Sequence, residues 1–278
     1  MGTSPRTITI DATDGERIHV YDLGPQDAPR TLVIVHGYGE HGGRYLQRAE
    51  RFVENGWRVL IPDMRGHGHS TGARGHVRRF AQYVADLDRV LLEARTDREH
   101  TALLGHSNGG LIVLTRLLQE PARFAACVVT SPLLGLAVEA PRWKIAAGRL
   151  MSQVLPRVSL PTEIRPEHLS HDPAVVAAYA SDPLGHKVVN SRWFTEAMQA
   201  VDDAFANAGR VRVPLLVIQS GDDRIASPEA SRQWAGAAPS EFVEFEEVPG
   251  AFHELLFETD GDEHMLRVRA FLEQRCPA

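Results

Sequence analysis

Cysteine is scarce in this chain. Only Cys127, in an apolar run, and Cys276, near the C-terminus, occur among 278 residues. This excludes a disulfide framework and makes a reducing interior the default setting, with Cys127 a buried free thiol. No apolar run is long enough to span a bilayer, and the first residues lack the apolar core of a secretory signal. We therefore expect a cytoplasmic protein, peripheral to a membrane at most.

Positive charge is not in excess either. Lys and Arg number 30 against 36 Asp and Glu, which gives a formal net charge of −6 and a pI near 6.1. This balance argues against nucleic acid, or an anionic membrane, as an obligate electrostatic partner. Internal repeats and low-complexity stretches are also missing. What the chain does have is 43% hydrophobic residues, enough for one large core.

Short apolar runs alternate with amphipathic runs along most of the sequence. Strands are predicted over 7–10, 17–21, 32–35, 57–61, 101–104, 126–130, 213–218 and 242–248, and helices over 44–54, 76–95, 228–237 and 261–274. This alternation indicates an α/β fold whose mostly parallel sheet is flanked by helices, with the active site at the C-terminal ends of the strands. From 134 to 208 repeated prolines break the pattern. We expect a helical cap insertion there, without sheet, and a core formed by 1–133 and 209–278.

The sequence Gly105-His106-Ser107-Asn108-Gly109-Gly110 lies between the predicted strand at 101–104 and a further predicted helix at 111–118. A G-x-S-x-G motif in this context predicts a nucleophile elbow, a tight turn that presents a serine at the strand tip. The glycines leave room for the neighbouring chain, and the helix N-terminus favours a developing oxyanion. Ser107 is therefore the candidate nucleophile.

A serine hydroxyl needs a base to accept its proton and an acid to orient that base. In this fold the chain order is Ser, then Asp or Glu, then His. Two loops that follow late strands qualify: one contains Asp222 and Asp223, and the other contains His253. Either aspartate is a candidate acid on these grounds, and His253 is the candidate base.

Two backbone N–H groups are needed to bind the oxyanion. One comes from the residue after the nucleophile and the other from the loop after the third strand. These residues are Asn108 and Tyr38.

Several motifs resemble those of monoacylglycerol lipases and related lysophospholipases, which are α/β-hydrolases. They are H-G-x-G-E-H-x-x-R-Y at 36–45, D-x-R-G-H-G-x-S-x-G at 63–72, G-H-S-x-G-G at 105–110, the acid loop at 219–225 and G-x-x-H-E at 250–254. The resemblance covers nearly the whole chain and places the acid at Asp223. The chain departs from the family pattern at Asn108, where methionine is usual.

The resemblance implies hydrolysis of a monoacylglycerol-type lipid ester through an acyl-enzyme, without a cofactor. A lysophospholipid or a short-chain ester is the alternative substrate. It also implies that the histidines at 36, 41 and 67 shape loops, so no metal site is expected. Two other functions stay open: a serine aminopeptidase, for which Glu139, Glu163 and Glu167 could hold an amino group, and a non-catalytic binding protein of the same fold.

Apolar residues of the insertion suggest how a substrate is held. Trp143, Leu150 and Trp193 are candidates to line an acyl tunnel, although they could equally pack the cap against the core. An exposed apolar cap face could also touch micelles or membranes transiently.

Overall fold

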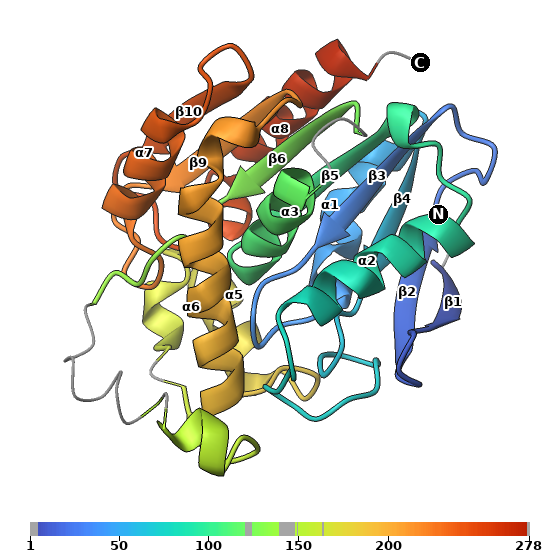
Figure 1. The fold of residues 1–278 in the computed structure, drawn as a ribbon. Coiled ribbons are helices and arrows are strands. Elements are labelled where there is room, and N and C mark those ends of the chain that lie inside the picture. The colour runs from blue at the N-terminus through green and yellow to red at the C-terminus, as the bar shows by residue number, and fades with distance from the viewer. Residues whose placement is uncertain (1–4, 120–123, 139–147, 149, 163, 277–278) are drawn as a thin grey trace.

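A mostly parallel eight-stranded sheet runs through the molecule, as the computed structural model shows (Figure 1). The structure describes residues 5–119, 124–138, 148, 150–162 and 164–276. The strand order is β1-β2-β4-β3-β5-β6-β9-β10, and the antiparallel pairs in it are β1 with β2 and β2 with β4. The strands are β1 (Arg6–Asp11), β2 (Arg17–Leu23), β3 (Arg30–Val35), β4 (Trp57–Pro62), β5 (Thr101–His106), β6 (Ala126–Thr130), β9 (Leu215–Ser220) and β10 (Val243–Val248). The predicted α/β fold is confirmed.

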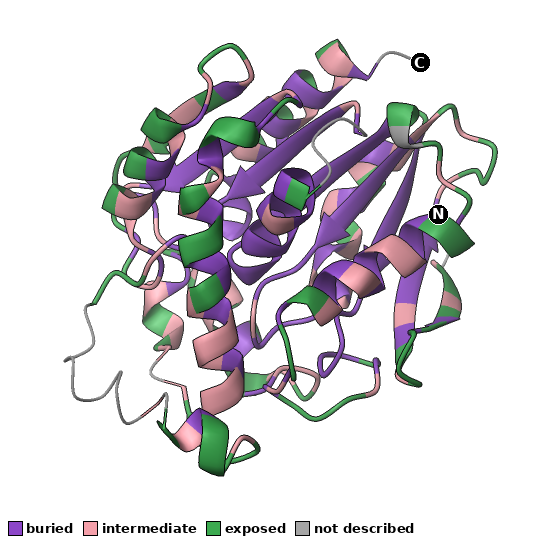
Figure 2. Cartoon of the chain, in the orientation of Figure 1, coloured by how far each residue is buried: buried purple, intermediate pink, exposed green. Residues whose placement is uncertain are grey.

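Helices cover both faces of this sheet. The face in front in Figure 1 packs against α2 (Ala81–Glu93), α3 (Asn108–Gln119) and α6 (Ser191–Ala206), and the other against α1 (Leu46–Val53) and α8 (Gly261–Arg275). α7 (Pro228–Ala237) lies beside β9 and β10. Because central strands such as β4 and β5 are buried along their whole length (Figure 2), their apolar residues follow one another without alternation. The charge of Arg58 in β4 is paired with Asp22.

The helix predicted over 76–95 starts later, at Ala81. The backbone N–H groups of Arg78 and Arg79 donate to the side chain of Gln82, and the N–H of Phe80 donates to Glu196 in α6. These bonds to side chains, one of them in another element, hold the preceding residues in turns instead of a helical turn.

The segment 134–208 contains α5 (Pro173–Ser181), α6 and a helical stretch at 150–154. It also contains a two-stranded antiparallel ribbon, β7 (Ser159–Pro161) with β8 (Val188–Asn190). The expectation of helix without sheet was therefore wrong in this detail. Strands of three residues are too short to show alternation, and a proline ends β7, which hides it further.

The remaining short elements are 3-10 turns: η1 (Gly42–Tyr45), η2 (Arg98–His100), η3 (Pro166–His168), η4 (Ala208–Arg210) and η5 (Leu255–Phe257). Across the part of the chain that the structure describes, no helix combines the length and the apolar character needed to cross a bilayer.

Candidate active site

Ser107 sits in the turn between β5 and α3, with a backbone φ of +51°. This left-handed conformation is strained for a residue with a side chain. The two glycines of the motif make the turn possible by close packing. A Cβ built on Gly105 would lie 2.5 Å from the carbonyl oxygen of Gly109, and one built on Gly109 would lie 2.0 Å from that of Val35. The strand–turn–helix geometry predicted from the motif is present.

Three side chains that are far apart in the sequence meet at this turn. The Nε2 atom of His253 lies 2.9 Å from the hydroxyl of Ser107, and its Nδ1 atom lies 2.7 Å from a carboxylate oxygen of Asp223. All three residues are buried, whereas Asp222 is exposed. The order of contacts is nucleophile, base and acid, which is the arrangement that lets a histidine accept the serine proton.

Asp223 is held on its far side by the backbone. Its second carboxylate oxygen accepts the N–H groups of Ile225 and Ala226 at 2.8 and 2.9 Å, and Gln219 donates to the first oxygen at 3.3 Å. With these bonds fixed, the carboxylate can orient only one imidazole nitrogen. The proton of neutral His253 therefore rests on Nδ1, which leaves Nε2 free to accept from Ser107.

The charge environment favours a protonated His253. Burial works against the imidazolium, but the charge and hydrogen bond of Asp223, with help from Glu254 and Glu40, outweigh it and raise the histidine pKa above its ordinary value. The neighbouring His106 ring lies 4.8 Å away, and its own pKa is lowered to about 4, first by burial and then by His253. Of the two rings, His253 is the one suited to carry the transferred proton.

The loop that follows β3 lies against the nucleophile. A Cβ built on Gly37 would lie 3.4 Å from the Cβ of Ser107. The next residue, Tyr38, turns its side chain to other partners: its hydroxyl donates to the carbonyls of Gly75 and Val188 at 3.1 and 3.0 Å. Asn108 is buried and is the first residue of α3. Asn108 therefore directly follows the nucleophile in the chain, and Tyr38 directly follows the glycine that packs against it.

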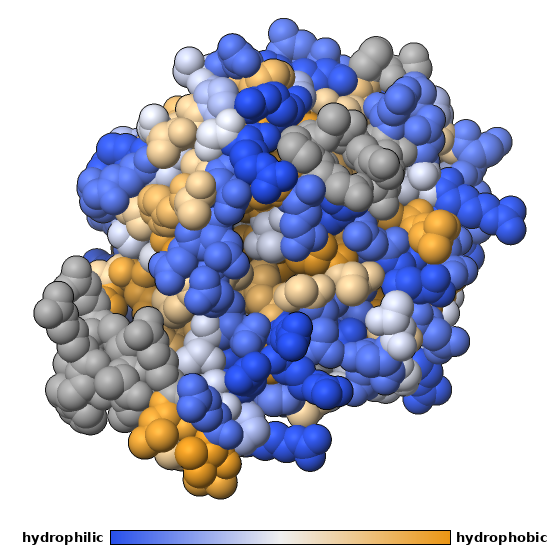
Figure 3. Space-filling model, viewed as in Figure 1, coloured by the Kyte–Doolittle hydropathy of each residue, from blue (hydrophilic) through white to orange (hydrophobic). Residues whose placement is uncertain are grey.

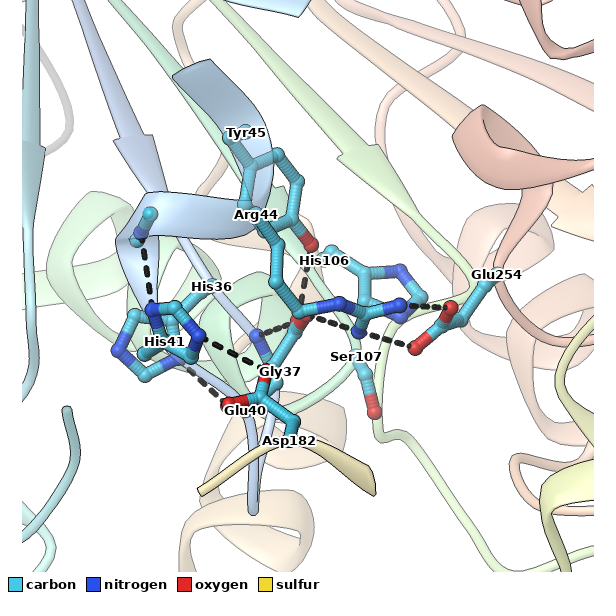
Figure 4. A network of polar contacts seen from close by, with 12 residues as sticks. His36, Gly37, Glu40, His41, Arg44, Tyr45, His106, Ser107, Asp182 and Glu254 are labelled. Atoms are coloured by element: carbon cyan, nitrogen blue, oxygen red, sulfur yellow. Dashed lines mark hydrogen bonds and ion pairs between the residues drawn. The ribbon is translucent and has the colours of Figure 1, made fainter. Parts of the chain in front are cut away.

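A buried charged cluster joins this loop to residues 249–254, the histidine loop, which contains His253 (Figure 4). Arg44 lies between Glu40 and Glu254 and donates to both carboxylates at 2.6 Å. Glu254 belongs to the G-x-x-H-E motif, but sequence reasoning gave it no role. The one feature of the sequence that could have pointed to Glu254 is its position directly after His253. Glu40 and Arg44 are four residues apart, but Glu40 precedes η1, so the pair joins the loop after β3 to that turn.

The histidines of the loops serve structure. His36 accepts the N–H of Met64 at 2.9 Å through Nε2, so its Nδ1 donates to the carbonyl of Gly37 at 2.7 Å. His41 lies 2.9 Å from Asp182. Asp63 accepts the N–H groups of Gly42 and His69. Within the described ranges, no three metal-ligating side chains are grouped so that they could hold an ion.

The candidate tunnel residues have different positions. Trp143 lies outside the described residues. Leu150 is 62% exposed, so it lies on the surface and lines no buried tunnel in this conformation. Trp193 is buried, and its ring centroid lies 3.8 Å from that of Tyr38. Trp193 therefore packs α6 against the loop of Tyr38, which is the packing alternative.

Comparisons with known proteins show which family the chain is similar to. The family model described as serine aminopeptidase, S33 matches residues 26–260. The chain is 33% identical over 254 residues to the monoacylglycerol lipase of Mycolicibacterium smegmatis, covering 88% of this chain and 89% of that protein. It is 29% identical over 245 residues to phospholipase YtpA of Bacillus subtilis, covering 87% and 95%. The crystal structure of Paleococcus ferrophilus monoacylglycerol lipase superposes with a TM-score of 0.87 at 28% identity, covering 93% and 99%.

Proposed function

The chain belongs to the serine aminopeptidase S33 family and is a carboxylic ester hydrolase of the monoacylglycerol lipase type, and from this premise we propose that Ser107, His253 and Asp223 form its catalytic triad. The observation that carries the proposal is the pair of short contacts made by His253, 2.9 Å to Ser107 and 2.7 Å to Asp223. These distances need no rearrangement before proton transfer.

In the proposed reaction the Ser107 oxygen attacks the ester carbonyl while His253 takes the hydroxyl proton. The carbonyl electron pair moves onto oxygen, where the N–H groups of Tyr38 and Asn108 bind it. The carbon–oxygen bond to the alcohol then breaks, and His253 gives the proton to the leaving oxygen. A water molecule repeats the sequence on the acyl-enzyme and releases the fatty acid. Asp223 stabilises the imidazolium in both halves.

We infer that the substrate is a lipid ester with one acyl chain. A monoacylglycerol is the first candidate, supported by the likeness to monoacylglycerol lipases, and a lysophospholipid is the second, supported by the likeness to a phospholipase. Both present one ester carbonyl next to a polar head, which suits one nucleophile and one oxyanion site.

We propose that residues 134–208 act as a cap that meets lipid surfaces. Apolar side chains in this segment face solvent: Leu150, Val154, Leu155, Val158 and Leu160 are 37% to 65% exposed. Figure 3 shows an apolar area at the lower end of the molecule, where this part of the chain lies in Figure 1. Exposed apolar patches of this kind mark sites of contact with membranes or partners.

An ester series tests the proposed triad. Hydrolysis of p-nitrophenyl esters and monoacylglycerols is measured beside an amino-acid p-nitroanilide. The wild type should cleave the esters, and Ser107→Ala should lose on the order of 10⁴-fold or more in kcat with an unchanged far-ultraviolet spectrum. Ester turnover by the folded Ser107→Ala variant would reject Ser107 as the nucleophile.

The same experiment weighs the aminopeptidase alternative, which the family description favours. Of the acidic residues considered for holding an amino group, Glu139 and Glu163 lie outside the described residues and Glu167 is exposed. Cleavage of the anilide alone would establish that alternative and reject ester hydrolysis.

A further inference from the structure

We propose that Glu40, Arg44 and Glu254 are positioning residues. As one charged cluster they fix the position of the oxyanion loop, residues 36–41, relative to the histidine loop. This inference rests on the proposed function, because it assigns the three residues to the same acyl transfer. None of the three needs to touch the substrate. They hold the chain neighbours of two groups that act on the substrate. Gly37 precedes Tyr38, whose N–H binds the oxyanion, and Glu254 follows the base His253.

The first end of the cluster fixes the oxyanion loop. One carboxylate oxygen of Glu40 accepts the N–H of Gly37 and, at 2.8 Å, the hydroxyl of Tyr45. Glu40 is only 3% exposed, so these bonds are not shared with solvent. The N–H of Gly37 belongs to the peptide between His36 and Gly37, one residue before the peptide that carries the N–H of Tyr38. The carbonyl of Gly37 lies on that second peptide and accepts from Nδ1 of His36 at 2.7 Å. Because a peptide plane is rigid, this bond sets the direction of the Tyr38 N–H, while Glu40 holds the peptide before it.

The other end fixes the histidine loop. Arg44 donates through two nitrogens to the two carboxylate oxygens of Glu254, each at 2.6 Å. The backbone N–H of Glu254 donates to the carbonyl of Leu169 at 2.8 Å. Glu254 directly follows His253, so its side chain and its backbone are both held one residue from the base. A forked guanidinium pair constrains direction as well as distance.

Aromatic rings pack against the guanidinium of Arg44, in the middle of the cluster. The guanidinium carbon of Arg44 lies 4.9 Å from the ring centroid of Phe257 and 5.6 Å from that of Tyr179. Arg44 also donates to the second oxygen of Glu40. One rigid planar cation thus links two loops that are 210 residues apart in the sequence.

The cluster also carries a surplus negative charge. Burial raises the pKa of Glu254, but both of its oxygens accept from Arg44, and this fork fits only the carboxylate. Although burial opposes ionisation, Arg44 and nearby histidines hold the pKa of Glu40 at about 2. Two carboxylates therefore face one guanidinium, and the remaining charge adds to that of Asp223 beside the imidazole of His253. His106 is a further titratable group packed against that ring.

The chain supplies a matched control for a buried ion pair with no link to the site. Arg58 is 7% exposed and donates through two nitrogens to Asp22 at 3.0 and 2.8 Å. It is the second residue of β4, whereas the loops of the site follow the C-terminal ends of their strands. Replacing Arg58 by lysine removes a fork of the same kind without touching either loop.

Four proteins test the proposal: the wild type, Arg44→Lys, Glu254→Gln and Arg58→Lys. Each is assayed on a soluble p-nitrophenyl ester from about pH 5 to 9, with Tm recorded and rates expressed per folded molecule. Lysine keeps the charge but loses the forked pair of hydrogen bonds, so Arg44→Lys should lower kcat about 10- to 100-fold and leave KM within about twofold. The acid limb, which is the fall in activity at low pH as His253 becomes protonated, should stay at the same pH. Glutamine removes charge at constant shape, so Glu254→Gln should lower kcat and move the acid limb to lower pH.

The Arg58→Lys control should keep the wild-type kcat and acid limb even if its Tm falls. If Arg44→Lys and Glu254→Gln lose only Tm and keep both kinetic properties, the cluster is merely structural and the proposal is overturned. Glu254→Gln alone decides the matter if Arg44→Lys does not fold, because its change is isosteric. Failure of the wild type to hydrolyse any ester would instead overturn the proposed function.

Discussion

His253 connects the chemistry of single residues to a measurable pH profile. Burial disfavours its charged form, yet Asp223 and the nearby carboxylates raise its pKa above the ordinary 6.5. A general base must be neutral to accept a proton, so activity is lost as pH falls through this raised pKa. The same carboxylates then stabilise the imidazolium once it forms.

The acid limb of kcat/KM should accordingly have its midpoint above pH 6.5 in the wild type. In Asp223→Asn the charge that raises the pKa is gone, so the limb should move to lower pH and kcat should fall by about 10⁴-fold. Rates measured across the pH range check both expectations. A limb that Asp223→Asn leaves in place would assign the titration to another group.

At the same scale, the sequence indicated some residues of the site and not others. Ser107 and His253 each follow a predicted strand within a short motif, so local patterns were enough to propose them. Local patterns left Asp222 and Asp223 open as the acid, and the family resemblance pointed to Asp223. Glu254 also lies in a motif, but its partner Arg44 is 210 residues away. No local pattern encodes an ion pair between distant loops, so its contact required the fold.

The turn between β5 and α3 shows how elements fix the nucleophile. The helix N-terminus can approach β3 only because Gly109 has no side chain, since a Cβ there would lie 2.0 Å from the carbonyl oxygen of Val35. Backbone atoms cannot swing aside as a flexible side chain can. The elbow is thus held by the packing of α3 on the sheet as well as by its own sequence.

Gly109→Ala should therefore destabilise the protein by about 1–3 kcal/mol or more and lower ester hydrolysis per folded molecule. Gly236 in α7 is the matched control, because a Cβ there meets no atom within 4 Å. Gly236→Ala should stabilise the protein by ~0.4–1 kcal/mol and leave kcat unchanged. Urea unfolding and ester assays measure both. An unchanged stability of Gly109→Ala would contradict the close packing described here.

Strands and helices of the core were predictable because apolar periodicity is strong where an element is buried against the sheet. Predictions were weaker where contacts between elements decide the outcome. The start of α2 depends on bonds to Gln82 and Glu196. The ribbon of β7 and β8 is too short to leave a pattern. Both features require partners that only the folded chain brings together.

On the scale of the whole molecule, the segment 134–208 differs from the core in that several of its large apolar side chains face solvent. Leu150 and Val154 lie four residues apart in a helical stretch and are 62% and 65% exposed. Such a pair lies on one helical face. An apolar cap is expected from the sequence, but the sequence does not distinguish residues that face solvent from those that pack inward, such as Trp193.

Replacing both Leu150 and Val154 by aspartate should weaken binding to phosphatidylcholine vesicles at least tenfold, since each inserted side chain contributes ~1.5–3 kcal/mol. KM for micellar monoacylglycerol should rise, whereas kcat/KM on a soluble short-chain ester should stay within about twofold. Leu92→Asp is the control, because Leu92 is 64% exposed at the end of α2. Equal loss of vesicle binding in the control would show that the segment has no special affinity for lipid.

In the proposed reaction Ser107, activated by His253 and Asp223, forms the covalent acyl-enzyme. The most direct measurement is peptide mapping by mass spectrometry after reaction with a long-chain p-nitrophenyl phosphonate, which traps the nucleophile as a stable adduct. We expect one equivalent of label on the peptide containing Ser107, no label in Ser107→Ala and much slower labelling in Asp223→Asn. Label on another residue, or undiminished labelling of Ser107→Ala, would show that Ser107 is not the nucleophile.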